Sequence, residues 1–306
     1  MNKHSPMSIS HYLKIIGRGK EGARALTRED AADLFGQVLD ARITDFEIGA
    51  FCLAMRLKGE TADEMAGFLD ATHARLHQVP TAGRRAVVLP SYNGARKLPV
   101  LTPLLALLLA REGLPVVLHG MVTEASRISS QNVLLALDIP AQTAIKSIAP
   151  GQVQFVPTGL LCPGLQRLLE VRRVVGLRNS AHSLVKLMNP CDGAAVVVGS
   201  YTHPEYATSM ADTFALLQAS ALLLRGTEGE PVADARRTPA MDAFANGQLN
   251  RVQEAQSGAL ASVPGLPAPD VASTAHWIRA VLAGQEPVPE PIALQVAHIV
   301  RLAAAT

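Results

Sequence analysis

The chain has 306 residues, of which 48% are hydrophobic and 18% charged, a composition that excludes an intrinsically disordered protein and predicts a compact fold. The most apolar run, VLTPLLALLLA at residues 100–110, is too short to cross a membrane, and the N-terminus has no hydrophobic signal core. The three cysteines lie far apart without CxxC spacing, so we expect a protein of the reducing cytoplasm.

The first 82 residues carry the signals of consecutive helices. A threonine is followed three residues later by an acidic residue at Thr27, Thr44 and Thr61. In such a capping box the threonine oxygen accepts the backbone N–H of the third residue, and the acidic side chain reaches back to the N–H of the threonine. The even spacing of the three starts fits helices of about twelve residues with short connections. We therefore predict a helical domain over residues 1–82.

From residue 83 onward, short β-rich runs alternate with helical patterns. The expected strands are 86–89, 115–118, 152–156, 194–198 and 221–224, and helical patterns at 99–111, 130–137, 204–218 and 272–282 separate most of them. Alternation of this kind is typical of a mostly parallel sheet with helices on its faces. The second predicted domain, residues 83–306, is therefore an α/β domain.

The loops that follow these strands are where a ligand is expected. In an open α/β sheet the binding crevice lies beyond the carboxyl ends of the strands. At this edge we expect residues 90–97, 119–130 and 225–237.

Positive charge is concentrated in the middle of the chain. Residues 84–186 contain twelve Lys and Arg against four acidic residues, whereas the rest of the chain has 16 basic and 22 acidic residues. The formal charge of +2 for the whole chain hides this separation. Charge of one sign concentrated in one segment attracts polyanions. Aromatic residues make up only 4% of the chain, which disfavours recognition built mainly on base stacking.

The segment LHGMVTEASRISSQNVLLAL at residues 118–137 resembles the hallmark of the anthranilate phosphoribosyltransferases, where Lys-His-Gly-Asn-Arg precedes a serine-rich loop and a Val-Leu-x-Ala-Leu helix. The likeness extends from KGET at 58–61 through VRR at 171–173 and NP at 189–190 to Gly226. It implies the fold that these enzymes share with nucleoside phosphorylases. That fold has a small helical N-terminal domain, through which the family commonly dimerises, and an α/β domain that binds phosphoribosyl pyrophosphate and magnesium.

The chain departs from this family where substrate would be held. Family enzymes hold the pyrophosphate with a Gly-Thr-Gly-Gly-Asp loop, whose backbone N–H groups approach the phosphates closely, and here the loop reads SYNGARK at residues 91–97. Met121 and Val122 replace the Asn and Arg that follow His-Gly in the family. Pro231 and Val232 replace the acidic pair that holds magnesium, and their side chains have no oxygen ligand.

Neighbouring carboxylates leave an alternative open. Glu228, Glu230 and Asp234 could supply a shifted Mg²⁺ site for phosphoribosyl pyrophosphate, and the protein would then be a phosphoribosyl or glycosyl transferase acting on another acceptor. Arg236 and Arg237 follow at once, so a salt-bridged surface turn is the simpler interpretation. We favour a protein without cofactor and assign no catalytic residue.

These losses, on a kept scaffold, resemble a branch of the family, the YbiB-type homologues, which share its fold and dimer and bind nucleic acids without marked sequence preference. The resemblance implies a protein that binds DNA or RNA phosphates through a basic groove across the former active-site mouth, with phosphoribosyl transfer lost and a homodimer formed through the N-terminal helices. The expected phosphate contacts are Arg85, Arg96, Lys97, Arg127, Arg167, Arg172, Arg173, Arg178 and Lys186.

Plainer interpretations of these cations stay open. Arg96 and Lys97 could be solvated loop cations. A salt bridge to Glu124 would account equally well for Arg127. Retained fold architecture alone would account for Arg172 or Arg173.

Overall fold

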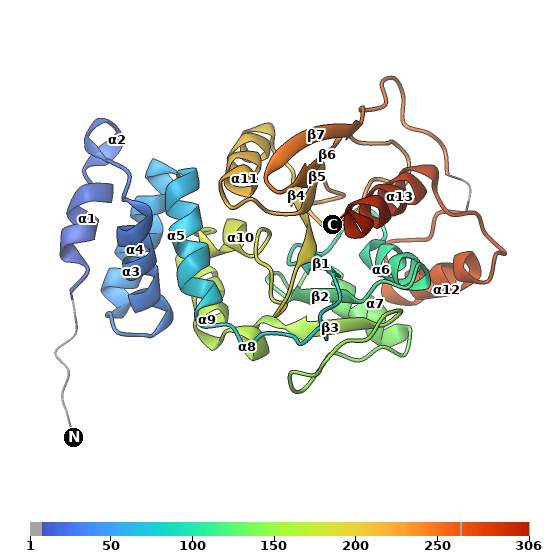
Figure 1. Ribbon diagram of the computed structural model, residues 1–306, viewed down its shortest axis with the longest axis horizontal. Helices are drawn as coiled ribbons and strands as arrows, with labels where there is room; N and C mark the ends of the chain where they lie inside the picture. The colour runs from blue at the N-terminus through green and yellow to red at the C-terminus, as the bar shows by residue number, and fades with distance from the viewer. Residues whose placement is uncertain (1–7, 264, 306) are drawn as a thin grey trace.

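The computed structural model describes residues 8–263 and 265–305. A layer of helices lies beside a sheet that carries helices on both faces (Figure 1). Residues 1–7 of the predicted helical domain and residue 306 of the α/β domain lie outside the described residues. The first five helices are α1 (Ser10–Ile16), α2 (Gly19–Gly22), α3 (Arg28–Leu39), α4 (Asp45–Lys58) and α5 (Ala62–His73).

The predicted helix starts are confirmed. Thr44 and Thr61 each form a complete capping box with the glutamate three residues later, and Thr27 accepts the backbone N–H of Asp30. The helices then pack around Phe35, Phe51 and Phe68, which are fully buried. The ring centroids of Phe35 and Phe68 are 4.6 Å apart, and Phe51 meets Phe68 edge to face at 5.9 Å. The N-terminal helices therefore have an aromatic core of their own.

The sheet has seven strands in the order β3-β2-β1-β4-β5-β6-β7. The first five are parallel: β1 (Ala86–Ser91), β2 (Val116–Gly120), β3 (Val153–Pro157), β4 (Ala195–Tyr201) and β5 (Ala221–Arg225). Their ends lie within three residues of the predicted ends. The antiparallel hairpin of β6 (Met241–Ala245) and β7 (Gln248–Gln253) was not predicted from the sequence.

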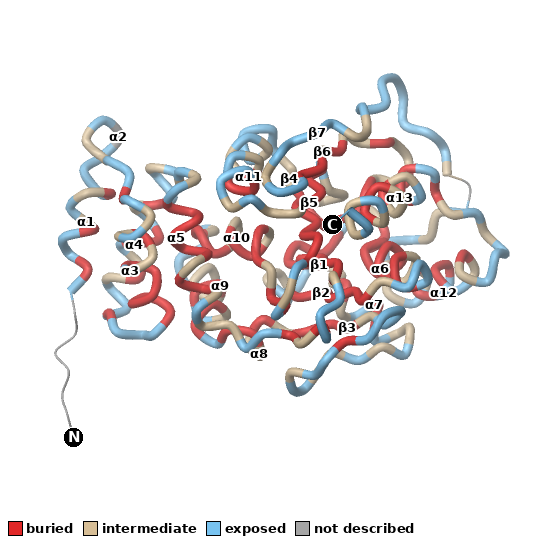
Figure 2. Tube along the Cα trace, viewed as in Figure 1, coloured by how far each residue is buried: buried red, intermediate tan, exposed pale blue. Residues whose placement is uncertain are grey.

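Helices cover both faces of the sheet, because successive strand residues point to opposite sides. Val87 packs in one buried cluster with α6 (Thr102–Arg111), α7 (Ser130–Ala136), α12 (Val271–Leu282) and α13 (Glu290–Ala304). Val88 packs in the other with α8 (Thr158–Leu161), α9 (Pro163–Val175), α10 (Ala181–Leu184), α11 (Pro204–Leu216) and the N-terminal helices. Figure 2 shows buried residues along the central strands and on several helices around them. In the described part of the chain, no helix has the length and apolar character needed to span a membrane.

The helical layer takes in more of the chain than residues 1–82. Helix α9 crosses the C-terminal end of α3 so closely that a Cβ on Gly164 would lie 2.2 Å from the carbonyl oxygen of Leu39. Arg167 donates to the carbonyl oxygens of Val38 and Leu39 at 2.9 and 3.1 Å. The sequence did not predict this contact, because the sequence of an amphipathic helix does not say which neighbour it packs against.

Gly164→Ala should destabilise the protein by about 1–3 kcal/mol, because the added methyl group forces α9 away from α3. Urea unfolding followed by circular dichroism measures the change. Arg173→Ala, an exposed position on the same helix, is the matched control and should stay within about 0.5 kcal/mol of the wild type. Equal stability of the two variants would contradict the close crossing.

Candidate functional site

The loops at the carboxyl edge of the sheet meet around the loop after β1. The Thr123 hydroxyl donates to the carbonyl oxygen of Tyr92 at 2.7 Å, and the Arg127 guanidinium donates to that of Gly94 at 3.2 Å. From the loop after β5, the carbonyl oxygen of Glu228 accepts the side-chain amide of Asn93 at 3.1 Å. The three segments that the sequence placed at one edge do lie together.

Glu230 sits at the centre of these loops with 1% exposure. Its Oε1 accepts the backbone N–H groups of Asn93 and Gly94 at 2.9 and 2.8 Å. Its Oε2 accepts from the hydroxyl groups of Ser91, Ser130 and Thr102 at 2.5, 3.1 and 3.2 Å. A buried carboxylate is costly unless hydrogen bonds replace its water, and here five donors surround it.

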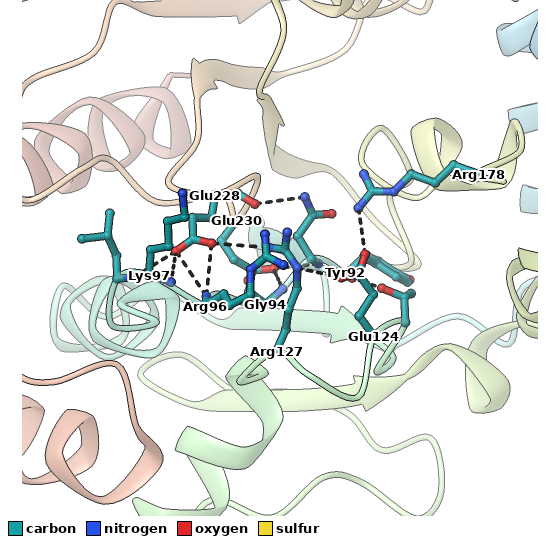
Figure 3. A network of polar contacts seen from close by, with 12 residues as sticks. Tyr92, Gly94, Arg96, Lys97, Glu124, Arg127, Arg178, Glu228 and Glu230 are labelled. Atoms are coloured by element: carbon teal, nitrogen blue, oxygen red, sulfur yellow. Dashed lines mark hydrogen bonds and ion pairs between the residues drawn. The ribbon is translucent and has the colours of Figure 1, made fainter. Parts of the chain in front are cut away.

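Glu228 accepts hydrogen bonds from the next residues of the same loop (Figure 3). Its Oε1 accepts the backbone N–H groups of Lys97 and Leu98 at 2.8 and 2.9 Å, and its Oε2 accepts that of Arg96 at 3.1 Å. The same Oε2 lies 3.5 Å from the Arg127 guanidinium. Glu228 and Glu230 together therefore accept five backbone N–H groups of one loop.

These carboxylates do not fit the alternative magnesium site. Glu228 and Glu230 are turned toward N–H and O–H donors, whereas a magnesium ion needs their lone pairs. Asp234 is paired with the Arg236 guanidinium at 2.8 Å. The described residues contain no group of three or more His, Cys, Asp or Glu placed to hold a metal ion. The shifted acidic pair is thus a set of hydrogen-bond acceptors in this arrangement.

Three arginines surround Glu124 in the loop after β2. Arg172 on α9 donates to one carboxylate oxygen, Arg127 donates to the other at 3.0 Å, and Arg178 lies 3.9 Å away. The hydrogen bond from Arg172 is the largest of the effects that hold the pKa of Glu124 below its usual range. Glu124 is therefore charged at neutral pH, but one carboxylate leaves two of the three positive charges unbalanced.

The positive charge extends beyond this group. Burial is the largest cause that lowers the pKa of His182 to about 4, and the charges of Arg178, Arg172 and Arg56 contribute to the same shift. Arg56 is an exposed residue in the last turn of α4. Arg56 was not among the predicted cations because it lies outside the basic segment 84–186. The fold brings its charge near His182 on α10.

Five of the predicted cations gather at the carboxyl edge, and we call this set the basic edge: Arg96, Lys97, Arg127, Arg172 and Arg178. Arg96 and Lys97 have exposed side chains, and Arg127 links them to the Glu124 group through Glu228. Figure 3 shows Arg96, Lys97, Arg127 and Arg178 together with Glu124, Glu228 and Glu230. Arg173 is exposed in the last turn of α9.

The other three predicted cations have structural partners. Arg85 lies at the amino end of β1 and donates to the carbonyl oxygen of Leu302 at 3.1 Å. Arg167 holds α9 to α3. The Lys186 ammonium donates to the carbonyl oxygens of Ser200 and Gly229, both at 3.0 Å, and burial lowers its pKa to about 8. A phosphate would have to break these contacts, so we leave the three out of the basic edge.

The chain is similar to known proteins over most of its length. Residues 10–75 match the helical bundle domain of a glycosyl transferase family. YbiB of Escherichia coli (strain K12) is 38% identical over 299 residues, covering 95% of this chain and 93% of YbiB. An anthranilate phosphoribosyltransferase of a Nocardioides species is 28% identical over 285 residues, covering 90% of this chain and 83% of the enzyme.

Solved anthranilate phosphoribosyltransferases share the fold. The enzyme of Thermus thermophilus superposes with a TM-score of 0.74 at 20% identity, covering 96% of this chain and 89% of the enzyme. The Saccharomyces cerevisiae enzyme in complex with PRPP and Mg has a TM-score of 0.71 at 13% identity, with coverages of 98% and 89%. The chain belongs to the anthranilate phosphoribosyltransferase-like proteins of glycosyltransferase family 3.

Proposed function

We propose that this protein binds the phosphate backbone of DNA or RNA through the basic edge, without sequence preference and without phosphoribosyl transfer. The supporting observation is the charge balance: the five cations of the basic edge lie beside three carboxylates, Glu124, Glu228 and the buried Glu230. The excess of two positive charges lies across the loops after β1 and β2, the C-terminal end of α9 and the segment that follows it. Phosphates spaced along a polymer match such a row better than a single small anion does.

The environment of the loop after β1 favours a polymer over a small phosphorylated substrate. The backbone N–H groups of residues 93, 94, 96, 97 and 98 are occupied by the carboxylates of Glu228 and Glu230. The side chains of Pro231 and Val232 are buried and contain no oxygen. The backbone donors that could hold a pyrophosphate are therefore occupied, and the positions of the family's acidic pair have no carboxylate, while side-chain cations remain at the rim.

A second copy of this chain is the protein partner that we propose. Phe46, Ala50, Leu53 and Leu57 lie on one side of α4, and the three larger residues are 92%, 47% and 76% exposed. An apolar stripe of this kind on a helix surface is typical of a protein contact. The stripe favours a homodimer through the N-terminal helices.

Neutralising Arg96 and Lys97 together, as Arg96→Gln/Lys97→Gln, should weaken binding to all oligonucleotides alike. Each lost phosphate contact should reduce the slope of log K against log salt by about 0.9 for duplex DNA. Fluorescence anisotropy with labelled single- and double-stranded oligonucleotides of unrelated sequence, over a range of salt concentrations, measures both effects.

Arg84→Gln/Lys146→Gln is the matched control for this pair. It removes the same charge from two exposed residues that precede β1 and β3, at the amino edge of the sheet. Binding should change much less in this variant. Equal losses in the two variants, or wild-type binding that is absent or independent of salt, would refute the proposed interface.

Glu124→Gln should increase nucleic-acid affinity. The amide keeps one acceptor oxygen, for either Arg172 or Arg127, but no longer neutralises these arginines, so the site gains one positive charge. We expect the salt slope to steepen by about one and the affinity at low salt to rise severalfold. The same anisotropy titration, on protein whose thermal unfolding shows that it is folded, checks this. Unchanged or weaker binding would place the nucleic acid elsewhere.

Leu57→Glu should convert the proposed dimer to a monomer, because a buried unpaired charge is strongly unfavourable in an apolar interface. Light scattering coupled to size-exclusion chromatography measures the mass. Leu249→Glu, on the exposed strand β7, makes the same change outside the stripe and should leave the dimer intact. A monomeric wild-type protein, or a dimer that survives Leu57→Glu, would contradict this assembly.

A further inference from the structure

The segment from Gly226 to Pro231, here called the carboxylate turn, places two anions against the backbone of the loop after β1. Glu230 accepts two of that loop's N–H groups, and Glu228 accepts three more. Converging backbone N–H groups of this kind form nests that bind phosphate and other oxyanions. The chain's own carboxylates therefore fill a site that has the chemistry of a phosphate nest.

Close backbone packing holds the carboxylate turn on the nest. Gly229 has a φ of +90°, and a Cβ at this position would lie 1.9 Å from the side-chain amide nitrogen of Asn93. The carbonyl oxygen of Gly229 accepts from the Lys186 ammonium at 3.0 Å and from the Ser200 hydroxyl at 2.9 Å. Glycine is required here because other side chains would push the turn off the loop.

We propose that the carboxylate turn is an internal anion that keeps free phosphate and pyrophosphate out of this nest. The two carboxylates belong to the same chain as the donors, so their effective concentration at the nest is high and a dissolved anion must displace them. A phosphate that approached would also meet the like charge of Glu228 and Glu230. The nest is a latent phosphate site that the protein itself closes. This inference does not depend on nucleic-acid binding at the basic edge.

Glu228→Ala is the variant that opens the nest. Glu228 contacts the exposed side of the loop, where water can replace its bonds to the N–H groups of Arg96 and Lys97, whereas Glu230 is buried and needed for folding. We expect inorganic pyrophosphate to raise the Tm of the variant by a few degrees at concentrations well above its Kd, and to have little effect on the wild type. The amide resonances of residues 96–98 should shift only in the variant.

Asp234→Ala is the matched control. It removes one negative charge from the neighbouring stretch, but Asp234 is paired with Arg236 and does not accept from the nest. An equal gain in Asp234→Ala would show a general charge effect and overturn the proposal. Equal stabilisation of the wild type by pyrophosphate, with shifts at residues 96–98, would overturn it as well, as would a folded Glu228→Ala that gains nothing.

Glu228→Gln keeps the test decisive where Glu228→Ala does not fold. The amide preserves the side-chain volume and one acceptor oxygen but lacks the charge that repels phosphate. We expect a smaller gain in pyrophosphate binding than in Glu228→Ala, with the same amide resonances affected. A folded Glu228→Gln that binds no more pyrophosphate than the wild type would overturn the proposal.

Discussion

The loop after β1 presents five backbone N–H groups to the carboxylates of Glu228 and Glu230, and the site is arranged around that contact. Buried N–H groups without an acceptor are costly, so the loop and the carboxylate turn stabilise each other. Arg127 is then oriented by Gly94 and Glu228 as well as by Glu124. The position of Arg127 at the rim thus follows in part from acceptors at the centre.

The fold divides the basic segment into cations with structural partners and cations at the rim. Arg85, Arg167 and Lys186 donate to backbone carbonyl oxygens, where they hold separate elements together. Arg172 and Arg178 instead share a single carboxylate with Arg127. Net charge in a sequence segment therefore overestimates the charge that a ligand can meet.

The scaffold and its loops have different requirements. The parallel sheet and the helical layer are held together by buried apolar side chains. The solved anthranilate phosphoribosyltransferases share this fold. Function depends on the few loop residues at the carboxyl edge. Glutamates that accept from the loop, with Pro231 and Val232 beside them, change that edge without disturbing the core.

The sequence by itself determined the helix starts at Thr27, Thr44 and Thr61, the five parallel strands and the loops that form one edge of the sheet. These features follow from local signals, since a cap spans three residues and a strand is a short apolar run. Only the tertiary structure decided that α9 packs on α3, that three arginines surround Glu124 and that Glu230 is an internal acceptor. The physical reason is distance along the chain: Glu230 accepts from Asn93 across 137 residues, and such contacts depend on how whole elements pack.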